Sequence, residues 1–179
     1  MSYDPIEIIE HAGMTIEIHQ DDDPESPREW DNLGTMVCNH RRYNLGDVKG
    51  NGDDVPEGAI TLPLYLYDHS GITMNTTGFS CPWDSGQVGV IYCTRDKALK
   101  EYGVKRLTKN VRQKVIEQLQ NEVEVYDMFI SGQCYGYVIK DDEGNELESC
   151  WGFFGMDHAT EEAKRQAEYC AKSSLSYAI

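Results

Sequence analysis

Alternation of apolar and polar residues is clearest in MTIEIHQ, which runs from Met14 to Gln20. A period of two places successive side chains on opposite faces, so this segment predicts a strand with one buried face. Short apolar runs bounded by Gly, Pro, Asn and Asp predict the remaining strands. These lie at 35–40, at 59–77 as two strands around a turn at 68–71, at 86–93, and on both sides of a turn at 141–145.

A spacing of three or four residues begins after Thr108 and predicts a long amphipathic helix that Gly132 ends. Its apolar stripe consists of Val111, Val115, Leu119, Val123, Tyr126 and Ile130. By the same signals, Thr94 and Gly103 bound a shorter helix. A third helix is expected to begin near Thr160, with an inner face of Ala163, Ala167, Cys170 and Ala171.

The order of these elements is five strands, two helices, two strands and a helix, which predicts an α+β fold. Adjacent hairpins favour a mainly antiparallel sheet of about seven strands, together with the three helices. A chain of 179 residues is expected to form a single domain, 1–179, in which residues 1–33 are an acidic, partly irregular N-terminal arm. Pro63 cannot donate to a strand ladder, which predicts an edge strand or a bulge there.

Charge changes this picture, because the chain has a net charge of −15 that is unevenly distributed. Residues 1–31 contain ten acids and one base, whereas residues 94–114 contain eight bases and two acids. The acidic excess repels nucleic acid and anionic membranes, so we expect neither direct nucleic-acid binding nor membrane binding. The first residues, MSYDPIEIIEH, carry acids where a secretion signal carries bases, and the six cysteines form no CxxC pair. A cytoplasmic protein with reduced thiols is therefore expected.

Four distinctive runs are EWDNLGTMVCNHRRYNLGD (29–47), LYLYDHSGITM (64–74), CPWDSGQVGVIYCTRDKALKEYG (81–103) and SCWGFFG (149–155). With these runs the chain resembles an uncharacterised family of small accessory proteins of bacteriophages and mobile elements. The resemblance brings no established activity. It implies a place in the cytoplasm of a bacterial host and a role against host machinery or host immunity, which is counter-defence.

The residues with useful chemistry are concentrated at a strand end (38–43), a turn (68–70) and a loop (80–85). Paired arginines can bind phosphate through bidentate contacts, aromatic rings can stack on a base, and a helix N-terminus attracts anions. These properties predict binding, without catalysis, cofactor or metal, of a small anionic, nucleotide-like ligand such as an immune signal. The candidate ligand residues are His40, Arg41, Arg42, Tyr43, His69, Trp83, Asp84, Ser85, Thr94 and Arg95. Gly86 and Gly89 are expected to let backbone approach the ligand.

Two other functions fit the same sequence. The acidic arm, residues 4–31, could dock through Trp30 on a basic host protein as a stoichiometric inhibitor, with a DNA mimic as the extreme form. A hydrolase would use a nucleophile, a base and an orienting acid, drawn from Cys81 or Ser80, His40 or His69, and Asp68 or Asp84.

A metal site built from Cys38 and His40, with His69 or Cys81, lacks the short paired spacing of structural zinc sites. We therefore expect no metal. The sequence leaves open whether the chain forms a homo-oligomer.

Overall fold

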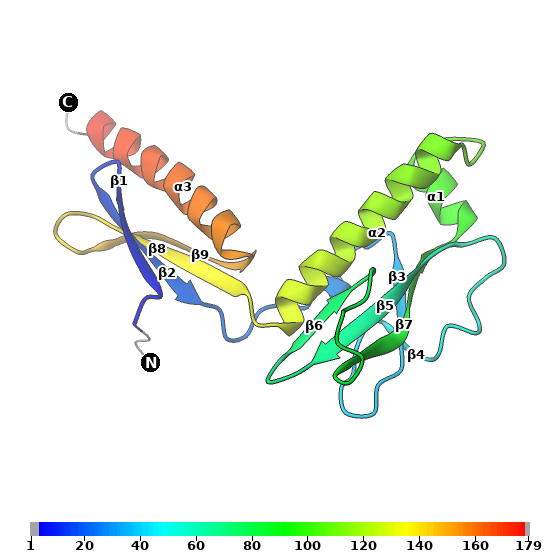
Figure 1. Cartoon of the computed structure of the whole chain (residues 1–179). Coiled ribbons are helices and arrows are strands. Elements are labelled where there is room, and N and C mark those ends of the chain that lie inside the picture. Colours follow the sequence, from blue (N-terminus) through cyan, green and yellow to red (C-terminus); the bar gives the residue numbers. More distant parts are fainter. Residues whose placement is uncertain (1–3, 178–179) are drawn as a thin grey trace. The chain divides into compact units, whose positions relative to one another are not determined.

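A computed structural model describes residues 4–177, which divide into two compact units (Figure 1). Unit 1 combines the two ends of the chain, 1–25 and 132–179, and unit 2 is the continuous segment 26–131. The prediction of a single domain does not separate these two units. Each unit has its own sheet and its own apolar core.

Unit 1 is a four-stranded antiparallel sheet with a long helix against one face (Figure 1). The strand order is β1-β2-β8-β9. Its elements are β1 (Glu7–His11), β2 (Met14–Gln20), β8 (Cys134–Lys140), β9 (Glu146–Phe154) and α3 (Met156–Tyr177). The alternation in β2 buries Ile16 and Ile18, and Ala163 and Ala167 of α3 are fully buried in the same cluster. Alanines at these positions let the helix lie close to the sheet.

Unit 2 is a five-stranded sheet in the order β4-β3-β7-β5-β6. The β3–β4 pair is parallel and the other pairs are antiparallel. Its elements are η1 (Pro27–Glu29, a 3₁₀ turn), β3 (Thr35–Cys38), β4 (Val48–Lys49), β5 (Ile60–Asp68), β6 (Ile72–Asn75), β7 (Ser85–Cys93), α1 (Arg95–Glu101) and α2 (Lys109–Ile130). The predicted stripe of α2 lies in the core, where Val115 and Leu119 contact the same cluster as Met36, Leu64 and Ile91.

The predicted helix caps are confirmed. Thr94 Oγ1 accepts from Lys97 N and Thr108 Oγ1 accepts from Val111 N, each at 3.3 Å. The third helix begins earlier than predicted, at Met156, because Gly155 ends β9 and its carbonyl accepts the first helical bond, from Ala159 N. Asp157 is the acid of its first turn.

The prediction of one sheet with about seven strands is too simple, since two sheets with four and five strands form. The sequence pattern missed β1 (EIIEH), whose acids obscure its alternation, and the two-residue β4. It also could not show that β2 pairs with β8, from the other end of the chain. Three helices of an α+β fold are confirmed.

Pro63 lies where the sheet locally has an edge. It pairs with Val90 of β7 on one side, whereas pairing with β6 on the other side starts only at Tyr65. The register against β7 also shifts between Leu64 and Tyr65, so an irregularity adjoins the proline. No second neighbouring strand therefore needs a hydrogen bond from the backbone nitrogen of Pro63, which carries no hydrogen.

Candidate functional site

The three segments with useful chemistry meet at one end of the unit 2 sheet. Because the β7 pairs are antiparallel, the first half of β7 lies beside the ends of β3 and β5. Cys38 pairs with Gly89 and Tyr67 pairs with Ser85. A cleft of about 500 Å³ opens there, and we call it the Arg41 cleft. It is lined by Asn39, His40, Arg41, Arg42, Leu66, Asp68, Trp83, Asp84, Ser85, Gly86, Gln87 and Val88.

Six of the ten predicted ligand residues line this cleft, namely His40, Arg41, Arg42, Trp83, Asp84 and Ser85. Tyr43 lines an adjoining pocket of about 190 Å³ that shares His40, Arg41 and Arg42. His69 reaches the cleft through Asp84, since its Nδ1 lies 3.2 Å from Asp84 Oδ2.

Thr94 and Arg95 lie elsewhere, beyond the opposite end of β7 from Ser85. The nine residues of β7, at about 3.3 Å each, span roughly 26–30 Å. One small ligand in the cleft cannot bridge that distance. The sequence analysis grouped Arg95 with the other arginines because of its charge and its position at a helix N-terminus.

One ion pair and one histidine–carboxylate contact lie at the cleft rim. The Arg42 guanidinium donates to Asp68 Oδ2 and lies over the Tyr43 ring, 5.4 Å from its centroid. Tyr43 Oη donates to the other oxygen of Asp68 at 3.3 Å. On the same rim, Asp84 contacts the imidazole of His69. Arg42 is therefore held in place, and any anion that it binds competes with Asp68.

Arg41 and Trp83 are the groups left available to a ligand. Arg41 is exposed, and no hydrogen bond or ion pair joins its guanidinium to another residue in the described part of the chain. Trp83 is 91% exposed, so its ring is a stacking surface that packing does not use. An exposed indole offers an apolar face on which a base can stack.

His40 serves the loop that carries the arginines. Its Nδ1 accepts from the backbone N–H groups of Arg42 and Tyr43, both at 3.3 Å. Its ring stacks on Tyr43 at 5.0 Å between centroids and an interplanar angle of 9°. These contacts hold the turn in which Arg41 is presented.

The hydrolase residues come together in a different order from that of a catalytic triad. Cys81 Sγ donates directly to Asp84 Oδ2 at 3.8 Å, and His69 Nδ1 contacts the same oxygen. A triad places the imidazole between nucleophile and carboxylate. Here the thiol contacts the carboxylate directly, and no imidazole lies between them.

The buried thiols of unit 2 are unreactive by their surroundings. Burial raises the pKa of the Cys38 thiol to about 12, so it is protonated at neutral pH. Burial also raises the pKa of the Cys93 thiol. Within residues 4–177, no three His, Cys, Asp or Glu side chains gather as a metal site.

Gly89 has a different role from the predicted one. A Cβ at this position would lie 2.0 Å from Val37 O, so glycine is required by the close β3–β7 contact rather than by a ligand. Gly86 lines the cleft, and a Cβ there would meet nothing within 4 Å. Of the two glycines, only Gly86 adjoins the ligand space.

An ion network that the sequence did not reveal joins η1, α2 and the loop after β3. Arg28 donates to Asp47 at 2.8 and 2.9 Å and to Glu122 at 3.1 Å. Asp47 accepts from Met36 N at 2.7 Å, which ties the loop back to β3. The acids and the arginine are distant in sequence, so neither spacing nor charge run indicated this network.

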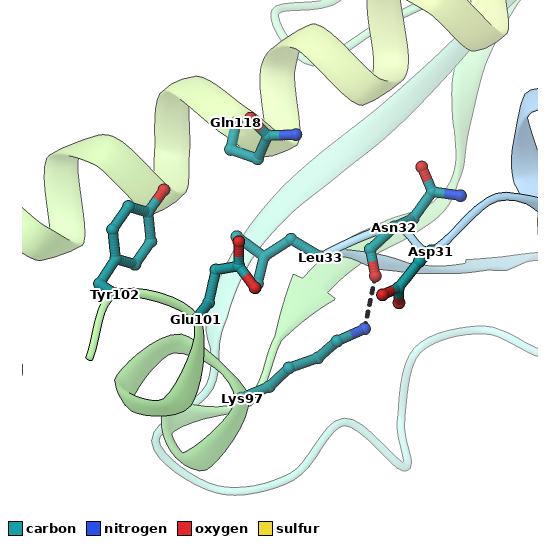
Figure 2. A pocket seen from close by; sticks show the side chains of 7 residues that line it. All are labelled: Asp31, Asn32, Leu33, Lys97, Glu101, Tyr102 and Gln118. Carbon is teal, nitrogen blue, oxygen red and sulfur yellow. Dashed lines mark hydrogen bonds between the residues drawn. The ribbon is translucent and has the colours of Figure 1, made fainter. Parts of the chain in front are cut away.

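A separate pocket, of about 130 Å³, lies between the segment that follows η1 and the helices α1 and α2 (Figure 2). It is lined by Asp31, Asn32, Leu33, Lys97, Glu101, Tyr102 and Gln118. Lys97 extends toward Asn32 and donates to its carbonyl at 2.5 Å. The pocket is too small for a nucleotide.

Comparison with known proteins does not extend this assignment, because no family model, curated protein or solved structure matches the chain. Within residues 4–177, none of the helices has both the length and the apolar character needed to cross a bilayer. The function has to be argued from the Arg41 cleft itself.

Proposed function

We propose that the protein binds a small anionic, nucleotide-like ligand in the Arg41 cleft and acts by sequestering it. The observation that carries the proposal is the pairing of an unpartnered guanidinium, Arg41, with the exposed ring of Trp83 on one cleft. A guanidinium binds phosphate through two parallel hydrogen bonds, and an indole stacks on a base. The volume of about 500 Å³ lies in the range of small-molecule sites.

The two arginines have different roles in this proposal. Arg41 contacts the anion, while Arg42 is held by Asp68 and supports the rim. On the resemblance to phage accessory proteins, the biological role would be counter-defence, with an immune signal as the sequestered nucleotide. Catalysis is not part of the proposal, because Cys81 donates to Asp84 rather than to an imidazole.

The ligand can be identified directly from the protein. Purified protein is incubated with a bacterial nucleotide extract, washed, denatured, and the released molecules are analysed by mass spectrometry. Release of an intact nucleotide is the expected result. Release of a chemically altered nucleotide would favour the hydrolase, and release of nothing would favour the protein inhibitor.

Replacing Arg41 by Ala should weaken binding of the released nucleotide by about tenfold to hundredfold, as expected for loss of a charged donor worth about 1.5–3 kcal/mol. Arg41→Lys should also weaken binding, because a point charge lacks the bidentate fork. Calorimetric titration measures both.

Arg95→Ala is the matched control, since Arg95 is also an exposed arginine of unit 2 but lies beyond the far end of β7. It should bind as the parent does. Equal losses for Arg41→Ala and Arg95→Ala would mean that the cleft is not the site.

A further inference from the structure

The strongest feature outside the cleft is a concentration of positive charge on α1 and the first turns of α2. We call it the basic surface, and its members are Arg95, Lys97, Lys100, Lys105, Arg106, Lys109, Arg112 and Lys114. All eight are exposed. In Figure 1, α1 and the start of α2 lie at the same end of unit 2. With two acids in the same segment, its net charge is +6.

The positive charge of the basic surface contrasts with the acidic remainder of the chain. Unit 1 has seventeen acids and four bases, and unit 2 has fourteen acids and twelve bases. Eight of those twelve bases lie in the basic surface. Solubility alone does not account for such a local concentration in an acidic protein, because the acids already supply the net charge.

The cations are also unused inside the protein. Of the residues that the structure describes, none pairs a carboxylate with a member of the basic surface. Among the side chains of these eight residues, only that of Lys97 makes a hydrogen bond within the described part of the chain, to Asn32 O. The amide end of the α2 dipole adds further positive potential beside Lys109.

Charge complementarity requires an anionic partner, and two features favour protein over nucleic acid. Asp96 and Glu101 are interspersed among the bases of α1, and a phosphate backbone of uniform sign would meet them as repulsion. A long nucleic acid would also approach residues outside 94–114, whose net charge is −21. A short acidic peptide segment can match the local pattern and avoid the remaining surface.

We infer that the basic surface docks an acidic segment of another protein. This surface is separate from the Arg41 cleft, since it follows the far end of β7. Binding here would direct the protein to its partner and would not require the nucleotide. Docking at the basic surface can therefore be tested independently of the proposed function.

The test compares two variants with equal changes in net charge. Lys105→Glu, Lys109→Glu and Arg112→Glu together reverse three cations of the basic surface. Lys164→Glu, Arg165→Glu and Lys172→Glu together reverse three cations of α3 in unit 1, as the control. Circular dichroism checks that each is folded, and a glutamic acid in the first turn of α2 is compatible with the helix dipole.

The probes are a DNA duplex and a fluorescent acidic peptide in which single lysines are interspersed among the glutamates to match the mixed charges of α1, each titrated by anisotropy. The parent should bind the peptide more tightly than the duplex, and the affinity should fall as salt is raised. The basic-surface variant should lose about tenfold or more in peptide affinity, while the α3 control should bind within about twofold of the parent.

Several results would overturn the inference. They are tighter binding of the duplex, no binding of the peptide, or an equal loss in both variants, which would reflect net charge alone. Sedimentation velocity of the same samples adds one more: self-association that the basic-surface variant abolishes would make a second copy the occupant.

Discussion

Replacing Glu122 by Ala is expected to lower the free energy of unfolding of unit 2 by about 3–5 kcal/mol, because it removes one partner of a buried ion pair. The Glu122 and Arg28 side chains are only 5% and 6% exposed, and they lie 3.1 Å apart. Glu122 also accepts from the backbone N–H groups of Leu33 at 2.7 Å and Gly34 at 3.0 Å. Alanine leaves these donors and part of the Arg28 charge without a buried acceptor.

Glu124→Ala is the control for this change, since Glu124 is an exposed acid of the same helix. It should alter stability by no more than about 0.5 kcal/mol. Denaturant unfolding of both variants is followed by the fluorescence of Trp30, which adjoins η1 in unit 2, in a background with Trp83→Phe and Trp151→Phe. If Glu122→Ala is as mild as its control, the network does not hold η1 and β3 to α2.

Leu119→Ala is expected to lower the free energy of unfolding of unit 2 by about 2–5 kcal/mol, because apolar burial is lost and a cavity is left behind. Leu119 is fully buried in the unit 2 core. Its packing is tight, since a Cβ added to Gly34 would lie 2.6 Å from Leu119 Cδ2. The same denaturant unfolding measures the loss.

Asn121→Ala on the exposed side of α2 is the control and should be nearly neutral. A loss below about 0.5 kcal/mol for Leu119→Ala would show that the core of unit 2 is not formed around α2.

Local signals in the sequence were sufficient for most elements. Thr108 and Gly132 bound α2 because capping and a left-handed stop are chemistry of the adjacent backbone. The alternation in Met14–Gln20 identified β2 for the same reason. What failed was long-range pairing: nothing local links β2 with β8, so the second sheet was not predicted.

The sequence predicted those residues of the candidate site that lie at the ends of predicted strands. The turn after β3, the end of β5 and the loop before β7 were identified, and the antiparallel pairing brings them together. Arg95 was misplaced because its charge and its position at a helix N-terminus were considered without the length of the predicted strand 86–93, which separates it from the loop 80–85. The different roles of Arg41 and Arg42 depend on the partner Asp68, which is set by side-chain geometry.

The most direct test of ligand binding in the Arg41 cleft is the fluorescence of Trp83. The chain has three tryptophans, so a variant with Trp30→Phe and Trp151→Phe reports on Trp83 alone. The nucleotide released from the parent protein is titrated into this variant. The account predicts a saturable change in Trp83 emission, with a midpoint about tenfold to hundredfold higher when Arg41→Ala is added. Binding detected by calorimetry with no change in Trp83 emission would contradict it.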